Sequence, residues 1–363
     1  MTLQAKEVLN KIDYYMVGIS KLPNFDKPIK LSSNESALGM SPKAVKAAQS
    51  ALEHSHLYPE VNTERLSLAI AKEFDLDASR MVFGPGSDEL LTRIINTYAG
   101  PGDELIHSKN AYMQFPIYAK LAGATPVAAA DNDLHYSVEA ILSCVTERTK
   151  IVIIANPDNP SGTYMPGSEV RRLHAALPKH VLLIVDAAYE EFALVDDYES
   201  ATNLVHEFEN VIVTRTFSKV FGMAGIRLGW CYCPHDTADL LEKIGPSFPV
   251  NIAALEAGVA AIQDQAHTLE VLKHNAKWVE LFSRALEDMG LKAYQSQTNF
   301  VLVQFSKECG ITPQKMNDHL NLNGIIPRMF AVTDFSDKLR FTIGKEWEME
   351  KTIDVMKQLF SSK

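Results

Sequence analysis

The chain of 363 residues is too long for one small core and long enough for a large α/β domain with a smaller second one. Its 46% hydrophobic and 22% charged residues are typical of a soluble globular protein. The formal net charge of −10 argues against a general nucleic-acid or membrane-surface binder, because phosphate affinity requires basic clusters, but it allows local arginine pockets for small anions.

Cysteine usage and hydropathy favour a cytoplasmic protein. Cys231 and Cys233 lie two residues apart on an expected strand, which indicates buried reduced thiols and not a zinc knuckle. Residues 1–10 carry no apolar run of the signal-peptide type, and the chain has no stretch of 18 apolar residues. His54 and His56 have no third ligand nearby, so we expect no metal site.

The first forty residues are expected to form an arm with a polar loop over 30–39. Ser41 then caps a helix that has Pro42 in its first turn and runs to about residue 51, and a second helix is expected over 64–74.

Strands that alternate with helices over residues 80–235 predict a mostly parallel, doubly wound sheet. The runs at 150–155 and 181–185 are continuously apolar, as in strands covered on both faces. Strands are expected at 81–83, 105–107, 127–129, 150–155, 181–185, 211–213 and after Arg227, and helices at 90–98, 115–121, 137–143 and 167–177.

Polar residues follow several of these strands. Ligands of such sheets gather at the carboxyl ends of the strands. This rule places Gly86, Ser87, Asn159, Asp186, Tyr189 and Lys219 around one crevice. The glycine-rich turn at 84–86 favours an anion site at the start of a helix, and a structural N-cap by Ser87 explains it almost as well.

The strand at 211–213 stops at residues 216–218, and Lys219 comes just after its end, before a glycine-punctuated turn. A lysine held in a cleft with its ammonium partly desolvated can become the nucleophile that forms a Schiff base with a carbonyl. Arg227, eight residues on, can hold a phosphate in a bidentate manner. Lys219 alone is weak evidence, since most lysines are solvated surface groups.

Beyond Pro249 a helical tract leads to a smaller α+β part. It has expected strands at 300–305 and 339–343 and helices at 313–322 and 346–360. Arg328 and Arg340 stand in apolar surroundings, where a structural salt bridge and an anion site are equally open interpretations. We expect an N-terminal arm with a small-domain segment at 1–40, a large domain at 41–250, linking helices at 251–285 and a small domain at 286–363.

Four motifs occur in a characteristic order and spacing. They are Asn-Pro-x-Asn-Pro-x-Gly at 156–162, Asp-x-x-Tyr at 186–189, Ser-Lys at 218–219 and Gly-x-Arg-x-Gly at 225–229. Together they resemble the fold-type I pyridoxal-phosphate (PLP) aminotransferases of the aspartate aminotransferase superfamily. Further stretches are similar to its histidinol-phosphate aminotransferase family: Ser-Asn-Glu at 33–35, Leu-Tyr-Pro at 57–59, Gly-Ser-Asp-Glu at 86–89, Thr-Asn-Phe at 298–300 and Leu-Arg-Phe-Thr-Ile-Gly at 339–344.

The resemblance implies a role for each motif residue. Lys219 would bind the PLP aldehyde and later move a proton, and Asp186 would pair with the pyridinium nitrogen. Tyr189 and Asn159 would donate to the phenolate oxygen. The implied phosphate and ring contacts are Gly86, Ser87, Asp88, Thr216, Ser218 and Arg227, with Tyr112 stacked on the ring and Tyr58 reaching in from the neighbouring subunit of a homodimer.

On the substrate side, the resemblance implies that Arg340 binds the carboxylate of glutamate or 2-oxoglutarate and, with Arg328, the phosphate of the other substrate. Asn159 and Asn34 would also contact substrate. The family commonly has Pro in the loop at 34–39, where this chain reads Asn-Glu-Ser-Ala-Leu-Gly, and Asp158 is a variation expected not to matter.

The expected activity is transamination between L-histidinol phosphate and 2-oxoglutarate in histidine biosynthesis. The alternatives are an aromatic amino-acid aminotransferase on the same scaffold, a PLP lyase similar to threonine-phosphate decarboxylase, and an inactive relative that only binds a partner. Lys219, Asp186 and Tyr189 together argue against the last, because a binding module has no need of a Schiff-base lysine.

Overall fold

The computed structural model describes residues 18–59, 63–330 and 333–361, together with residues 3, 8, 10 and 12. Most of residues 1–17, the start of the arm predicted over 1–40, lies outside the described residues.

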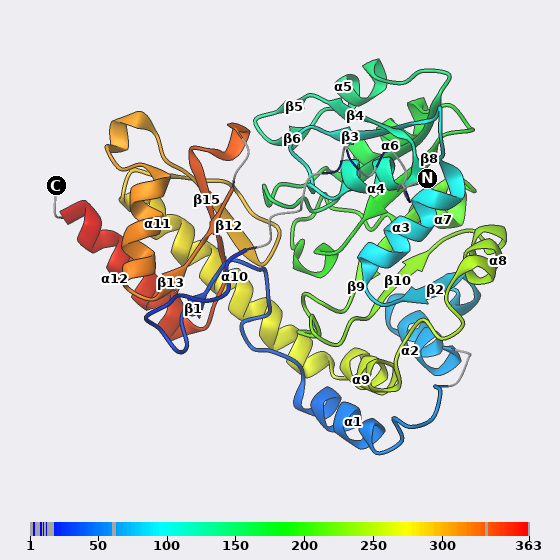
Figure 1. Ribbon diagram of the computed structural model, residues 1–363, viewed down its shortest axis with the longest axis horizontal. Helices are drawn as coiled ribbons and strands as arrows, with labels where there is room; N and C mark the ends of the chain where they lie inside the picture. The colour runs from blue at the N-terminus through cyan, green and yellow to red at the C-terminus, as the bar shows by residue number, and fades with distance from the viewer. Residues whose placement is uncertain are drawn as a thin grey trace.

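Apolar strands and amphipathic helices build one large sheet, which occupies the right half of Figure 1. Strands β9, β8, β7, β3 and β4 run parallel to one another, and β10 runs antiparallel to both β9 and β2. This confirms the predicted mostly parallel sheet. Within the described residues the seven strands lie in the order β2 (Met81–Gly84), β10 (Gly229–Tyr232), β9 (Val211–Thr216), β8 (Leu182–Asp186), β7 (Thr149–Ala155), β3 (Glu104–Ser108) and β4 (Thr125–Ala129).

Helices cover both faces of the large sheet because successive strand residues point to opposite sides. Along β7, Ile151 and Ile153 pack with α3, α4 and α8, whereas Val152 and Ile154 join the core beneath α6 and α9. The helices of the large-sheet region are α1 (Pro42–Leu52), α2 (Glu64–Phe74), α3 (Ser87–Tyr98), α4 (Phe115–Ala122), α5 (Val138–Ser143), α6 (Gly167–Ala176), α7 (Thr202–Glu207), α8 (His235–Ile244) and α9 (Ile252–Gln263).

Local signals set several helix ends where the sequence predicts them. The Ser41 hydroxyl accepts hydrogen bonds from the Lys43 and Ala44 amides at the start of α1, as an N-cap residue does. The start of α3 differs from the prediction, since the helix begins at Ser87 and not near residue 90. Its N-cap is Gly86, without a side-chain bond, so the interpretation of Ser87 as the N-cap is wrong.

A second, smaller sheet lies on the left in Figure 1. Val301, Val303 and Phe341 on one face pack against α10, α11 and α12, while Leu302 and Arg340 lie on the other face. Within the described residues its strands follow the order β11 (Lys292–Ala293), β12 (Phe300–Gln304), β15 (Lys338–Thr342) and β14 (Arg328–Met329), and its helices are α10 (Gln265–Asp288), α11 (Pro313–Leu322) and α12 (Glu346–Ser361).

The N-terminal arm pairs with the small-sheet region. Strand β1 (Ile29–Lys30) runs parallel to β13 (Ile325–Ile326), and the Leu31 amide donates to the Ile326 carbonyl at 2.9 Å. From β1 the described chain crosses from the small sheet to the large one and returns along α10 (Figure 1). Among the described helices, none combines the length and the apolar character needed to span a membrane.

Candidate active site

A pocket lies at the carboxyl ends of β7, β8 and β9, where the order of the chain predicted a crevice. Ten of the expected site residues line it together, and Ala155, Pro157, Ala188 and Ala224 complete it. The ten are Ser87, Asp88, Tyr112, Asn159, Asp186, Tyr189, Thr216, Ser218, Lys219 and Arg227.

Asp186 ends β8 with its carboxylate buried in this pocket. Burial, and then the nearby Asp88 carboxylate, raise the pKa of Asp186 to about 7. The Thr214 hydroxyl donates to Asp186 Oδ1 at 3.1 Å, and the Lys219 ammonium also favours the charged carboxylate. A carboxylate held this way favours a cationic partner in the pocket.

Lys219 and Tyr189 lie beside each other. Lys219 Nζ is 5.3 Å from the centroid of the Tyr189 ring, which in turn contacts Phe300 edge-on at 5.5 Å between centroids. Tyr189 is buried, so the amine and the phenol meet in a partly desolvated space. An amine in such a place can act as a nucleophile or carry a proton.

Asn34 connects the N-terminal loop to both sheets. Its amide nitrogen Nδ2 donates to the Tyr189 hydroxyl at 2.9 Å, and its backbone N–H donates to Thr342 Oγ1 at 2.8 Å. The Thr342 hydroxyl donates back to Asn34 Oδ1 at 3.0 Å. Its φ of 52° is a conformation that asparagine tolerates better than most residues. Because Asn34 donates to Tyr189, the phenol keeps its own proton to donate into the pocket.

The turn between β2 and α3 forms a cradle for an anion. Gly86 has φ +96°, and a Cβ there would lie 2.3 Å from Arg227 Nη2. The free amides at the start of α3 and the helix dipole attract negative charge. The Arg227 guanidinium donates to the Ala224 carbonyl at 3.0 Å and lies 3.4 Å from Ser218 Oγ. The Asp88 side chain accepts from the Tyr112 and Tyr118 hydroxyls through Oδ1, and its Oδ2 lies 3.9 Å from Arg227 Nη2.

Arg340 and Arg328 face each other across β15 and β14 and are both buried. Arg340 donates from Nη1 to Asn159 Oδ1 and from Nη2 to the Ser32 carbonyl at 3.2 Å. Its guanidinium carbon lies 4.8 Å from the Phe300 ring centroid, and that of Arg328 lies 5.5 Å from the Phe330 ring centroid. Like charges at directly opposite positions of neighbouring strands repel each other, which favours an anion between or beside them.

Tyr58 is not brought to this pocket within its own chain. Its side chain is 81% exposed and stacks on Phe248 with 4.5 Å between ring centroids. His54 and His56 are exposed as well, and no group of three or more metal-ligating side chains occurs in the described part of the chain.

Sequence reasoning missed the partners beneath the pocket. Thr214 precedes Thr216 by two residues on β9, so strand periodicity places both on one face and was a usable signal. Asp158 is buried, accepts from the Tyr136 hydroxyl at 3.0 Å and from Ser161 Oγ at 2.7 Å, and holds the loop that carries Asn159. The expectation that Asp158 does not matter is therefore wrong for the structure of this loop.

Comparisons with known proteins agree with this geometry. Residues 26–356 match the family model described as aminotransferase class I and II. The chain is 43% identical over 344 residues to the histidinol-phosphate aminotransferase of Paramagnetospirillum magneticum, covering 95% of each chain, and 42% identical to that of Rhodospirillum centenum, covering 94% of each. It is similar in structure to the histidinol-phosphate aminotransferase of Sinorhizobium meliloti in complex with pyridoxal 5'-phosphate, with a TM-score of 0.90 and 26% identity over 100% of this chain and 99% of that one.

Proposed function

The chain belongs to the aminotransferase class I and II family, and we propose that it transfers the amino group of L-histidinol phosphate to 2-oxoglutarate, giving imidazole-acetol phosphate and L-glutamate in histidine biosynthesis. The choice of substrate rests on the 43% identity to a histidinol-phosphate aminotransferase over 95% of both chains. The proposal of aminotransferase chemistry rests on Lys219 and the buried carboxylate of Asp186, which line one pocket.

The residues present fit pyridoxal 5'-phosphate. The turn at Gly86 has no room for a Cβ beside Arg227, so a phosphate group can approach the backbone there. The buried carboxylate of Asp186 can pair with a protonated ring nitrogen. When bound, this cofactor supplies an aldehyde for amines and a ring that accepts electrons from the bond being broken. The phosphate would be held by the backbone of Gly86, Ser87 and Asp88 and by Thr216, Ser218 and Arg227, with Tyr112 against the ring.

Lys219, Asp186 and Tyr189 divide the catalytic work. The Lys219 amine would hold the cofactor aldehyde and would take up and deliver the substrate proton. The Asp186 carboxylate would pair with a positive charge on the ring side of the pocket, with Thr214 fixing its orientation. Tyr189 and Asn159 donate to an oxygen in the pocket, which is supported by their other contacts: Asn34 donates to the Tyr189 oxygen, and Asn159 Oδ1 accepts from Arg340.

The paired arginines bind the anionic ends of the substrates. Arg340 is fixed by Asn159 and the Ser32 carbonyl, and Arg328 lies beside it on the neighbouring strand. Planar guanidinium groups bind carboxylates and phosphates in a bidentate manner, so one pair can serve both half-reactions. Asn34 acts here mainly through Tyr189 and the adjoining loop.

The enzyme acts as a homodimer with shared sites, in the cytoplasm. Tyr58 and Phe248 form an exposed aromatic pair beside a groove that also carries exposed Leu68, a kind of apolar surface that a second copy covers. Such a dimer would bring Tyr58 to the partner's phosphate site. The four cysteines, all free, suit a reducing compartment.

The substrate is tested by comparing kcat/KM of the purified, cofactor-loaded protein for L-histidinol phosphate, L-phenylalanine and L-tyrosine with 2-oxoglutarate. We expect L-histidinol phosphate to be favoured by at least about tenfold, or about 1.4 kcal/mol of transition-state free energy. A tenfold preference for the aromatic acids would assign the aromatic alternative. Release of CO₂ from threonine phosphate without 2-oxoglutarate would assign the lyase.

A further inference from the structure

The hairpin of β5 (Asp131–Asn132) and β6 (His135–Tyr136) projects from the large-sheet region against the small sheet. At its tip Asp133 has φ 48° and Leu134 has φ 67°. A branched apolar residue rarely takes this left-handed conformation, which costs free energy that other contacts must offset.

Those contacts come from the small sheet. The Leu134 side chain is 8% exposed and packs in a cluster with Tyr294, Leu302, Phe330 and Phe335. The cluster adjoins the anion-binding face, because the guanidinium carbons of Arg328 and Arg340 lie 5.5 and 5.7 Å from the Phe330 ring centroid. Leu134, at the strained tip, therefore belongs to the same apolar cluster whose Phe330 ring contacts the guanidinium groups of Arg328 and Arg340.

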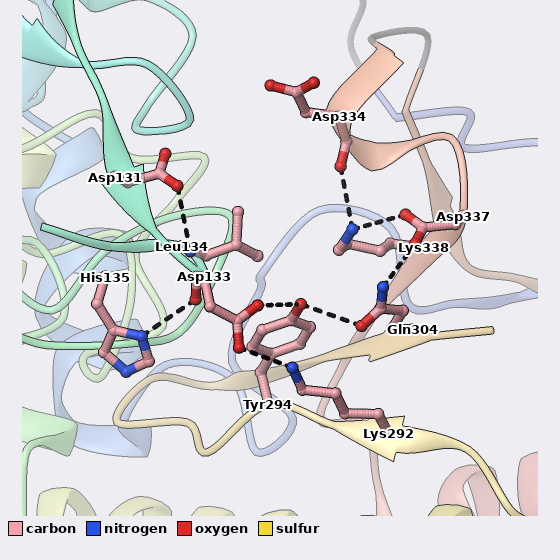
Figure 2. A network of polar contacts seen from close by, with 10 residues as sticks. All are labelled: Asp131, Asp133, Leu134, His135, Lys292, Tyr294, Gln304, Asp334, Asp337 and Lys338. Carbon is pink, nitrogen blue, oxygen red and sulfur yellow. Dashed lines mark hydrogen bonds and ion pairs between the residues drawn. The ribbon is translucent and has the colours of Figure 1, made fainter. Parts of the chain in front are cut away.

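Polar contacts continue this docking (Figure 2). The Tyr294 hydroxyl donates to Asp133 Oδ1 at 3.0 Å, and Lys292 Nζ lies 2.7 Å from Asp133 Oδ2. Gln304, beside Tyr294, donates to Asp337 at 2.7 Å, and Asp337 accepts from Lys338. Lys338 and Arg340 are two residues apart on β15, so they lie on the same face of the small sheet.

The hairpin is also bonded to the loop that carries Asn159. The Leu134 carbonyl accepts from Thr163 Oγ1 at 2.9 Å, and the Tyr136 hydroxyl donates to Asp158 in the loop of Asn159. Asn159 is also the residue to which Arg340 donates. One hairpin thus fixes both partners of the Arg340–Asn159 contact.

We propose that the β5–β6 hairpin is a positioning element for the anion site: Leu134 and the Asp133–Tyr294 bond dock the small sheet so that Arg328 and Arg340 meet the anionic group of the substrate. This inference rests on the proposed function. The buried Leu134 side chain contributes most of the docking free energy. The Asp133–Lys292 ion pair contributes little, because both of its side chains are more than half exposed. The docked arrangement is the one that binds substrate, so weaker docking lowers the fraction of competent molecules and raises the apparent KM.

The test compares Leu134→Ala and Tyr294→Phe with wild-type holoenzyme. We expect KM for both substrates, and the inhibition constant of inorganic phosphate, to rise about tenfold for Leu134→Ala and about threefold for Tyr294→Phe, with kcat within twofold. Leu134→Met restores the apolar side chain and should recover most of the affinity. Tyr164→Phe is the matched control, since the Tyr164 hydroxyl donates to Asp197 at 2.7 Å away from the small sheet.

The inference is overturned if KM and phosphate inhibition stay within twofold of wild type, or if kcat falls while KM is unchanged. An equal rise in KM for Tyr164→Phe also overturns it. Thermal melting and cofactor occupancy show that each variant is folded, and Leu134→Met carries the test if Leu134→Ala unfolds. Failure of the wild-type protein to transaminate would contradict the proposed function instead, and calorimetric binding of inorganic phosphate to the same variants would still test the hairpin.

Discussion

Two buried aspartates at the pocket have different tasks although both have raised pKa values. Asp186 lines the pocket and receives a hydrogen bond from Thr214. Asp158 lies beneath it, where Tyr136 and Ser161 donate to its two oxygens. Desolvation is the largest cause of the raised pKa in each case. The first carboxylate is placed for a ligand and the second for the loop that carries Asn159.

Asp158 should make stability depend on pH. Burial raises the pKa of Asp158 to about 7, whereas an unfolded aspartate titrates near pH ~3.9. Between these pH values the native Asp158 binds more protons than the unfolded one. Its contribution to the free energy of unfolding therefore falls as pH rises from about 4 to about 7 and stays constant above pH 7. Asp158→Asn should therefore show a smaller drop in melting temperature from pH 5 to pH 7.5 than wild type, at equal cofactor loading.

Asp334→Asn is the control for this experiment. A hydrogen bond from Lys109 lowers the pKa of Asp334, so its contribution is lost only below about pH 4 and the slope from pH 5 to 7.5 should match wild type. An unchanged slope in Asp158→Asn would contradict the assignment.

At the scale of elements, the turn between β2 and α3 shows how closely backbone and side chains approach at the anion cradle. Gly86 has a positive φ and no room for a Cβ beside Arg227. A Cβ at Gly229, on the adjoining strand β10, would lie 2.5 Å from the Ser87 nitrogen. Glycine at both positions lets strand β10 and Arg227 close around the start of α3.

Gly86→Ala should weaken cofactor binding by about tenfold or more, because the new methyl group displaces the Arg227 guanidinium and one charge-assisted contact is lost. Equilibrium dialysis of pyridoxal 5'-phosphate measures this loss. Gly102→Ala is the matched control: Gly102 has φ +97°, close to the +96° of Gly86, but no atom lies within 4 Å of its Cβ position. The control should lose stability from backbone strain and keep its affinity, and an equal loss of affinity in both variants would contradict the cradle.

At the scale of the whole molecule, the site is assembled from distant parts of the chain. The pocket belongs to the large sheet, the arginine pair to the small sheet, and Asn34 to the arm between them. Tyr58 is exposed and outside the pocket of its own chain, so its proposed role requires a second copy.

Shared sites predict complementation between inactive chains. Tyr58→Ala and Lys219→Ala homodimers should each be impaired, and co-expression should restore about a quarter of the wild-type activity, since half of the dimers are hybrids with one intact site. Lys219→Ala mixed with Asp186→Asn should restore none, because both residues line the same chain's pocket. Sedimentation should give twice the chain mass of 40.3 kDa. Equal recovery in the two mixtures would contradict sharing across the dimer.

Local sequence signals determined most elements of this fold. The helix at 64–74 and the helix at 313–322 have the predicted bounds, because apolar periodicity and terminal residues such as Thr312 and Pro313 act within a few residues of each other. Short elements without such signals were missed, among them the two-residue strands β1, β5 and β6 and the six-residue helix α7, and the ten-residue helix α8 was missed as well.

The sequence by itself determined the family, the alternating strands and helices, and the residue types at the strand ends, since motif spacing and periodicity are properties of neighbouring residues. Only the tertiary structure decided that Asn34 bonds Tyr189, that Arg340 meets Asn159, and that Leu134 enters the apolar cluster of the small sheet. These pairs are more than 150 residues apart, and their contacts depend on how two sheets and an arm pack together. No local pattern encodes that arrangement.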